Sequence, residues 1–356
     1  MKKEYDVIII GSGPAGSASG IVLGRSGQLK VLMIDKKKLP RHKICSGMVS
    51  RSAQNALKKI GLDIPEVICT RPKKGKGIKI QFKIGNDLLE IPERYLNVWR
   101  RDFDYWLNIE ANKLSVKIKD ESELIDIIKE DEKLKARIRY KDQKSSKWKI
   151  KEYITKYVIG ADGGTSKTRK IIYPEFKRET AIAYQEYWKG KINIDPQYFH
   201  AFMDRELSAG YAFCNKKEDQ IIIGVGAEKG NRIKVYQKKF IQYLEKGWGL
   251  QLDTFIRSEG CASTNIFREE PIFNHLHGKN NTLLVGEAAD LFNIMGEGIP
   301  SAIKSGKSAA ESILKNIDHP SMDVVEIYRE KNKKLVKKLK KNWEGYYKRY
   351  ETFTQI

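Results

Sequence analysis

The sequence predicts an α/β fold in which a Rossmann-like domain is assembled from discontinuous segments, with an inserted, mainly antiparallel β-sheet domain and a C-terminal helix. The first observation is a strand–turn–helix–strand pattern over residues 5–35. The second is a pair of later apolar runs, 157–169 and 283–306, that each end in a glycine-rich turn. The third is the alternating, aromatic-rich pattern of 173–273, which is typical of β-strands. This interleaving implies that three separated segments build one nucleotide-binding domain.

Composition narrows the class of protein. Apolar residues make up 40% of the 356 residues, as in a folded globular chain. No apolar run approaches the roughly 20 residues that span a bilayer, and a strand begins too early for a signal peptide, so we expect a cytoplasmic protein. Cys45, Cys69, Cys214 and Cys261 are scattered without metal-ligand spacing. This spacing argues against a disulfide framework and against a metal site.

The chain is strongly basic, with 67 Lys and Arg against 45 Asp and Glu and a net charge of +22. Such a charge attracts anionic partners, including nucleic acid, acidic lipid and phosphorylated substrates. The lysines are spread over the whole chain and are not gathered in one stripe, which favours a compositional bias as the source of the charge. No nucleic-acid recognition motif accompanies them, so we expect no specific nucleic-acid partner.

The first motif is a complete dinucleotide-binding signature. A buried strand over 7–10 leads into GSGPAG, residues 11–16, and a small-residue helix follows. Gly11 permits the tight turn, Gly13 lets a pyrophosphate approach the backbone, and Gly16 allows the helix to pack closely on the strand. The next strand, 30–35, ends in Asp35, which is placed to accept hydrogen bonds from an adenosine ribose.

The following elements are predicted from their periodicity. A basic, irregular loop, 36–50, precedes a helix over 50–61, and short strands cover 75–99. Residues 100–114 have the apolar spacing of a helix. Charged, alternating strands then lead to a buried strand at 157–159. One helix, near 234–246, interrupts the later β region.

The carboxyl end predicts one long basic helix. Its apolar residues recur at spacings of three and four, which gives a single stripe: Leu335, Leu339, Trp343, Tyr346, Tyr350 and Phe353. The stripe either packs on the body of the protein or, because lysines crowd the other faces, docks on an anionic membrane. We therefore divide the chain into a nucleotide-binding domain (1–70, 95–172 and 274–318), a substrate domain (71–94 and 173–273) and a basic amphipathic helix (319–356).

Two later glycine turns extend the first motif. The second lies in YVIGADGGTSKTR, residues 157–169, and the third in LLVGEAADLFNIMGEGIPSAIKSG, residues 283–306. Together and in this order, the three motifs resemble the FAD-binding fold of p-hydroxybenzoate hydroxylase-type flavoproteins. That resemblance implies that the second motif lies near the pyrophosphate and that the third contacts the ribityl chain and the flavin.

Further stretches resemble the geranylgeranyl reductase family. They are PRHKICSG (40–47), NVWRRDFDYWL (97–107) and GEGIPSAIKSGKSAAESI (296–313). The resemblance implies an FAD-dependent reductase of isoprenoid carbon–carbon double bonds, with NADPH or reduced ferredoxin as the electron donor. An apolar substrate, contact with the inner face of the membrane and an acidic ferredoxin-like partner are the expected associations.

The resemblance also carries site residues onto this sequence. Cys45, Lys43 and Tyr211 are the expected catalytic residues, and His42 lies in the same loop. The expected FAD-binding residues are Gly11, Ser12, Gly13, Pro14, Ala15, Gly16, Asp35, Lys36, Cys45, Ser46, Gly47, Arg100, Ala161, Asp162, Gly163, Gly286, Glu287, Gly296, Glu297, Gly298 and Ile299.

Some positions depart from the family pattern. Glu287 stands where the family has Asp, and Ile294 replaces a proline. The aromatic substrate signature is reduced to GYAFCNK, in which Tyr211 remains, Phe213 replaces Trp, and 215–216 replace Phe-Pro. Two alternatives to the reductase therefore stay open. One is an FAD-dependent monooxygenase on the same fold, and the other is a decayed flavoprotein that binds membranes or other anions.

Overall fold

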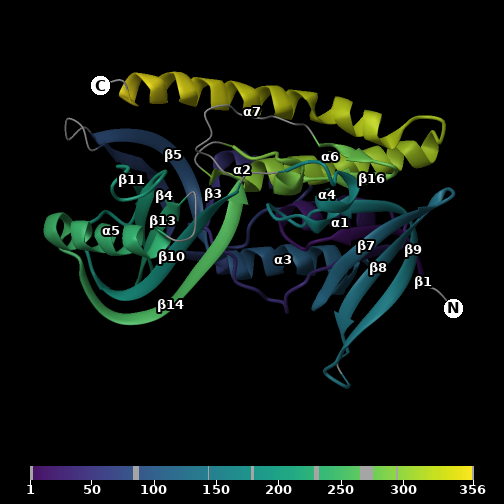
Figure 1. Ribbon diagram of the computed structural model, residues 1–356, viewed down its shortest axis with the longest axis horizontal. Helices are drawn as coiled ribbons and strands as arrows, with labels where there is room; N and C mark the ends of the chain where they lie inside the picture. The colour runs from purple at the N-terminus through teal and green to yellow at the C-terminus, as the bar shows by residue number, and fades with distance from the viewer. Residues whose placement is uncertain are drawn as a thin grey trace.

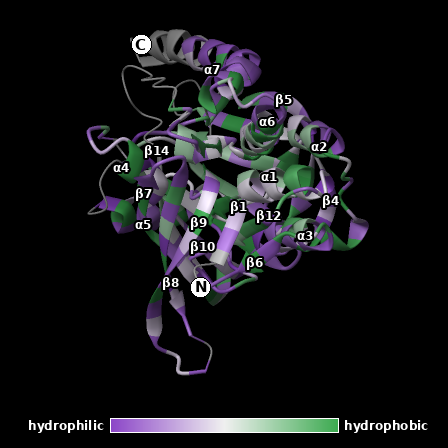
Figure 2. Cartoon of the chain, turned by 90° about the vertical axis from the view of Figure 1, so that its right-hand side faces the viewer, coloured by the Kyte–Doolittle hydropathy of each residue, from purple (hydrophilic) through white to green (hydrophobic). Residues whose placement is uncertain are grey.

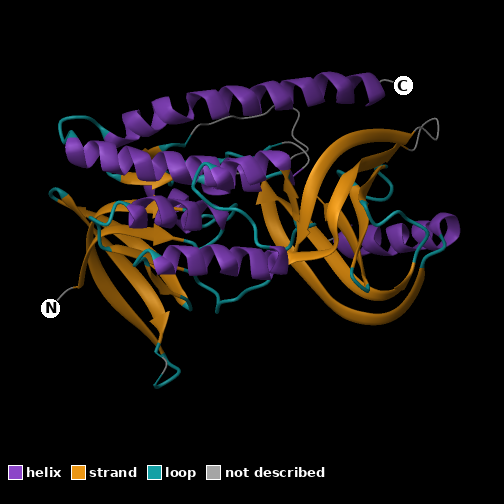
Figure 3. Cartoon of the chain, turned by 180° about the vertical axis from the view of Figure 1, so that it is seen from behind, coloured by secondary structure: helices purple, strands orange, loops and turns teal. Residues whose placement is uncertain are grey.

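The computed structural model describes residues 3–82, 88–142, 144–177, 180–227, 232–264, 276–293 and 296–354. Its strands form two eight-stranded sheets. Figures 1 and 3 show that these two groups of strands lie at opposite ends of the molecule, with helices between them. The predicted α/β architecture is confirmed.

The first sheet carries the nucleotide-binding motifs. Its order is β15–β16–β9–β1–β2–β6. Off this path, β8 pairs with β9 on one side and with β7 on the other. The strands are β1 (Lys3–Ile10), β2 (Val31–Ile34), β6 (Lys117–Lys119), β7 (Ser122–Glu130), β8 (Lys133–Lys141), β9 (Trp148–Gly160), β15 (Gly278–Lys279) and β16 (Thr282–Leu284). The pairs β16–β9, β9–β1, β1–β2 and β2–β6 are parallel. The side chains of residues 7–10 and 31–34 are all buried, as expected for central strands covered on both faces.

Helices cover this sheet. They are α1 (Pro14–Arg25), α2 (Arg51–Lys58), α3 (Arg100–Lys113), α4 (Lys167–Ile172) and α6 (Ile299–Asp318), with the short turns η1 (Glu66–Ile68) and η3 (Gly286–Ala289). Small residues let α6 pack directly on α1. A Cβ at Gly306 would lie 2.3 Å from the carbonyl oxygen of Ala15, and Ser19 donates a hydrogen bond to the carbonyl of Gly306 at 3.0 Å. The small-residue run thus holds the third motif against the first.

The second sheet has the order β14–β10–β13–β12–β11–β4–β5–β3. Its strands are β3 (Met48–Ser50), β4 (Cys69–Phe82), β5 (Leu88–Val98), β10 (Thr180–Lys191), β11 (Tyr198–Met203), β12 (Ala212–Lys217), β13 (Gln220–Ala227) and β14 (Gln251–Thr264), and α5 (Ile233–Trp248) packs on it. All pairs except β4–β11 are antiparallel. β3 and the last residues of β5 belong to this sheet, although the predicted division assigns them to the nucleotide-binding segments. The division into domains itself stays a prediction.

The long terminal helix α7 (Val324–Thr354) runs beside α6 along one side of the molecule (Figure 1). Leu339 and Trp343 are each 5% exposed, and the indole of Trp343 donates a hydrogen bond to the carbonyl of Phe292 at 3.0 Å. Leu335 packs against the buried cluster that contains Leu339 and Leu291. The first three residues of the predicted stripe therefore pack on the body, whereas the side chains of Tyr346, Tyr350 and Phe353 lie outside the described ones. No helix in the described ranges is long and apolar enough to cross a membrane.

Candidate functional site

The three glycine turns meet because their strands are neighbours in one parallel sheet. Ile10 pairs with Gly160, and Gly160 pairs with Leu284. The carboxyl ends of β1, β9 and β16 therefore reach the same edge, which is the usual ligand-binding edge of such a sheet. The turns also touch: a Cβ at Gly11 would lie 2.4 Å from the carbonyl oxygen of Ala161, and one at Gly164 would lie 2.6 Å from Oε1 of Glu287.

The first turn leaves an opening at Gly13. Gly11 has φ +104°, and a Cβ at Gly16 would lie 1.9 Å from the carbonyl oxygen of Gly11, so both glycines are required by close backbone packing. Gly13 differs, because the nearest atom to its added Cβ is Nη2 of Arg41 at 3.5 Å. No side chain caps the N-terminus of α1 at this point. An open helix N-terminus beside a guanidinium suits a pyrophosphate.

Asp35 directly follows β2 at the same edge of the sheet. Its carboxylate accepts hydrogen bonds from the hydroxyl of Ser12 at 2.8 Å and from the backbone N–H of Lys37 at 2.9 Å. Arg41 Nε lies 2.9 Å from the same carboxylate. Burial tends to raise the pKa of Asp35, but Arg41 and these hydrogen bonds outweigh it, and the pKa is lowered. Asp35 is therefore an ionised acceptor that already has protein partners.

The second turn is built around Asp162 and Arg169. The Asp162 carboxylate accepts hydrogen bonds from Ser166 and Thr168 and so shapes the start of α4. The side chain of Arg169, a residue 3% exposed, donates to the carbonyls of Gly164 at 2.6 Å and Ala288 at 2.8 Å. Arg169 thus joins the second turn to the third.

We expect Arg169→Met to lower the free energy of unfolding by about 2–4 kcal/mol and to weaken cofactor binding, because two buried carbonyls lose a charged donor. Chemical denaturation followed by tryptophan fluorescence measures the change. Lys170→Met, at the exposed next residue, serves as the control and should leave stability unchanged. Equal stability of the Arg169 variant and the wild type would show that the hydrogen bonds of Arg169 between the second and third turns do not stabilise the fold.

The third turn supplies Glu287 from η3 and the loop 296–298. Glu287 lies in the cavity wall beside Gly164, and the hydroxyl of Tyr211 lies 3.4 Å from a Cβ placed on Gly296. The loop thus faces Tyr211, which immediately precedes β12 of the second sheet. Ile294, the position of the lost proline, lies outside the described residues.

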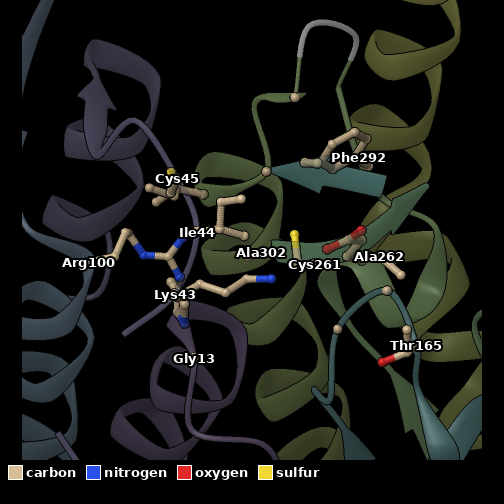
Figure 4. A pocket seen from close by; sticks show the side chains of 18 of the residues that line it. Gly13, Lys43, Ile44, Cys45, Arg100, Thr165, Cys261, Ala262, Phe292 and Ala302 are labelled. Atoms are coloured by element: carbon tan, nitrogen blue, oxygen red, sulfur yellow. The ribbon is translucent and has the colours of Figure 1, made fainter. Parts of the chain in front are cut away.

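A second cluster surrounds the loop 42–47. Gly47 donates a backbone hydrogen bond to the sulfur of Cys45 at 3.3 Å, and Arg100 hydrogen-bonds the same side chain. Arg100 also donates two hydrogen bonds to the Asp104 carboxylate, from Nε at 2.8 Å and from Nη2 at 2.9 Å. Its charge is therefore largely compensated by Asp104. Figure 4 shows Lys43 reaching across the cavity toward Cys261.

Lys217 of β12 lies behind this loop and is fully buried. Its ammonium nitrogen donates to the carbonyl of Val98 at 2.8 Å and lies 5.2 Å from the ring centre of Trp99. Burial lowers the pKa of Lys217 to about 7. The strand beside the loop thus carries an amine that changes charge near neutral pH.

One cavity of about 1220 Å³ is lined by residues of the three glycine turns and of the loop 42–46. The expected catalytic residues Cys45, Lys43 and Tyr211 all line it. So do most of the expected cofactor residues: Gly11, Gly13, Pro14, Ala15, Asp35, Lys36, Ser46, Arg100, Ala161, Asp162, Gly163, Glu287, Gly296, Glu297, Gly298 and Ile299. Ser12, Gly16, Gly47 and Gly286 are outside the lining. They shape the turns from behind, as Gly286 does by donating its N–H to the hydroxyl of Ser305 at 2.9 Å.

The far side of the cavity is apolar and belongs to the second sheet. Ile78 and Ile80 come from β4, Ile91 from β5, and Phe199 and Phe213 from β11 and β12. The rings of Phe199 and Phe213 stack at 5.2 Å. A ligand pocket of drug size occupies roughly 300–1,000 Å³, so this cavity has room for a dinucleotide and part of a second, apolar molecule.

Sequence reasoning missed three residues of the site. Arg41 lies within the quoted loop 40–47, and Arg169 ends the second motif, so a search for cations near the turns finds both. Lys217 gives no such signal, because it follows another lysine in a polar stretch and reads as exposed. Its burial follows from the pairing of β12 within the sheet, with Lys217 opposite Gln220 of β13.

The turns, the open helix N-terminus and Asp35 define a dinucleotide-binding flavoprotein, and the residues fit FAD. A family model described as FAD binding domain matches residues 4–254, so the chain belongs to this family. The protein is therefore an FAD-binding protein of the oxidoreductase class, and the predicted cofactor is confirmed at that level.

Comparison with known proteins agrees with this assignment. The chain is 27% identical to protein CbrA of Escherichia coli O157:H7 over 325 residues, which cover 88% of this chain and 85% of CbrA. It resembles the crystal structure of a geranylgeranyl bacteriochlorophyll reductase-like protein from Thermoplasma acidophilum, with a TM-score of 0.80, 22% identity and coverage of 100% and 89%. The flavin-dependent brominase Bmp2 matches with a TM-score of 0.70 and 21% identity, over 92% of this chain and 83% of that one. These structures show a shared fold.

Proposed function

We propose that the protein is an FAD-dependent reductase of carbon–carbon double bonds in an isoprenoid or another apolar substrate. The supporting observation is that the cavity runs from the three FAD-type turns directly to the apolar wall formed by Ile78, Ile80, Phe199 and Phe213. A substrate with a long hydrocarbon part would bury its surface against this wall.

The site has residues for each part of FAD. The N-terminus of α1 at Gly13, with Arg41 beside it, would hold the pyrophosphate, and Asp35 the adenosine ribose. Glu287 would reach the ribityl chain, and the loop 296–298 would lie against the ring. FAD, when bound and reduced, supplies the electron pair for the reduction.

The chain's own residues would supply the proton. Reduction of an alkene needs a proton for the second carbon, and the thiol of Cys45 lies in the cavity wall where it can provide one. Arg100 and the N–H of Gly47 hold the Cys45 sulfur in place. Lys43 would renew the proton from the solvent side, and Tyr211 would orient the substrate next to Gly296.

We also propose that the electron donor binds transiently, as NADPH or a reduced ferredoxin-like protein. The sequence contains a single complete GxGxxG unit, which FAD would occupy. The net charge of +22 would steer an acidic donor protein to the surface.

An anaerobic assay tests the reductase. The purified protein is reduced with one equivalent of dithionite under nitrogen and mixed with geranylgeraniol or with its saturated analogue. We expect flavin absorption to return with the unsaturated alcohol alone and mass spectrometry to detect a product heavier by two hydrogens. Return of absorption only after oxygen is admitted, with oxygen incorporated in the product, would identify a monooxygenase instead.

Cys45→Ala should slow this anaerobic reoxidation by about 100-fold, because general acid catalysis contributes roughly 10²–10⁴-fold. Cys261→Ala is the matched control, since Cys261 also lines the cavity but lies on β14, away from Arg100. It should react at nearly the wild-type rate. Equal rates for both variants and the wild type would remove Cys45 from the reaction.

A further inference from the structure

The solvent face of α7 carries an uncompensated row of cations. We call Lys334, Lys337, Lys338, Lys340 and Lys341 the lysine face. All five are exposed, and none lies within 4 Å of a carboxylate in the described part of the chain. The opposite side of the helix is anchored to the body by Leu339 and Trp343. The row is therefore held on a helix that is packed on the body of the protein, and Figure 2 shows the hydrophilic character of α7.

Two more lysines extend the lysine face across the neighbouring helices. Lys304 of α6 is half-buried and donates a hydrogen bond to the hydroxyl of Ser52 at 3.0 Å. Burial lowers its pKa, and the charges of Lys338 and Lys59 lower it further, whereas Glu297 raises it. α6, α7 and the residue that follows α2, Lys59, thus bring like charges close together. Such an arrangement is stabilised when an anion lies over it.

Exposed apolar side chains lie on the same side of the molecule as α7. Leu88, Leu89 and Ile91, at the start of β5, are 53%, 46% and 39% exposed. Ile91 also lines the cavity. Figures 1 and 2 place β5 and α7 on the same side of the molecule. Exposed leucines on the same side of the molecule as a cationic helix suit a lipid surface, whereas a nucleic acid would gain nothing from them.

We propose that the lysine face, with Lys59 and Lys304, docks the protein on an anionic phospholipid bilayer and brings the apolar start of β5 to the lipid. The docking follows from charge complementarity and exposed apolar residues. Its purpose, delivery of an apolar substrate from the bilayer to the cavity, rests on the proposed function.

Vesicle co-sedimentation with the full chain tests the docking. Vesicles of phosphatidylcholine with phosphatidylglycerol are compared with phosphatidylcholine alone, at low and at high salt. We expect binding to the anionic vesicles at low salt and loss of that binding in the other conditions, because the Debye length shrinks as salt is added. The triple variant Lys334→Glu, Lys337→Glu, Lys341→Glu should reduce partitioning at least tenfold, since each lysine near an anionic surface contributes about fivefold.

The matched control is Lys129→Glu, Lys144→Glu, Lys147→Glu, which changes net charge equally. These lysines are exposed; Lys129 lies next to the last residue of β7, and Lys144 and Lys147 lie in the β8–β9 turn, which Figure 1 shows on the opposite side from α7. The control should bind like the wild type. Equal loss in both variants, or binding to neutral vesicles, would overturn the proposal. So would binding to duplex DNA that depends on the lysine face while vesicle binding does not.

This experiment uses no substrate, so its result is independent of the reaction. The lysine-face variant should still reduce geranylgeraniol in solution like the wild type. Docking without reductase activity would support the docking surface but would contradict its proposed role in delivering an apolar substrate to the cavity. Reductase activity without docking would overturn the proposed docking surface and leave the proposed reductase function intact.

Discussion

Gly13→Val should yield a folded protein that has lost FAD. Gly13 has φ −74°, which any residue adopts, and a Cβ there meets only Nη2 of Arg41 at 3.5 Å. The valine side chain would instead fill the space that a pyrophosphate needs beside the N-terminus of α1. We expect the purified variant to be colourless, with at least a 100-fold weaker FAD affinity, equivalent to about 3 kcal/mol. Titration with FAD, followed by flavin fluorescence, measures the loss.

Gly11→Ala is the contrasting variant. Gly11 has φ +104°, and its Cβ would lie 2.4 Å from the carbonyl oxygen of Ala161, so the protein itself should lose stability. Thermal unfolding separates the two: the Gly13 variant should melt like the apo wild type and the Gly11 variant earlier. Normal flavin content in the Gly13 variant would show that the cofactor binds elsewhere.

Lys217→Met should remove a large pH dependence of stability. Burial lowers the pKa of the folded-state amine to about 7 from an unfolded value of 10.5. Below about pH 7 both states carry the proton, so the native state bears the full cost of burying an ammonium group. Between these values only the unfolded state binds the proton, and wild-type stability should rise by up to about 1.4 kcal/mol per pH unit. The variant should lack this rise and be more stable than wild type near pH 7.

Urea denaturation at pH 7, 8 and 9 measures this slope. Lys216→Met is the matched control, because Lys216 precedes Lys217 on β12 and points to the other face, where it is partly exposed. It should keep the wild-type slope. A Lys217 variant with the wild-type slope would show that the buried amine does not titrate in this range.

Much of the cofactor site could be predicted because its residues are contiguous. The strand–turn–helix run through 11–16 and the acid at Asp35 are local patterns, and α1, α2, α3 and α5 formed close to their expected ranges. Local geometry also assigned the correct role to Gly16, which packs against Gly11. The three turns were expected to hold one molecule, and their adjacency followed once each strand was placed in the same sheet.

Other parts depended on contacts between distant residues. Arg169 reaches Ala288, 119 positions away, and Lys217 reaches Val98 at the same separation. No local sequence pattern predicts such distant partners, because the sequence does not show whether a given lysine or arginine is buried or exposed. For the same reason the sequence, which places Asp162 among the expected FAD-binding residues, did not show that its carboxylate also shapes the start of α4.

The sequence by itself determined the class of fold, the FAD-type turns and the cationic, amphipathic character of the last helix. These follow from periodicity, glycine placement and charge, which act over a few residues. Only the tertiary structure decided which face of α7 meets the body, which lysine is buried, and that the cavity continues from the turns to the apolar sheet. Those outcomes depend on packing between segments that are far apart in the sequence, where burial and the pairing of strands determine each environment.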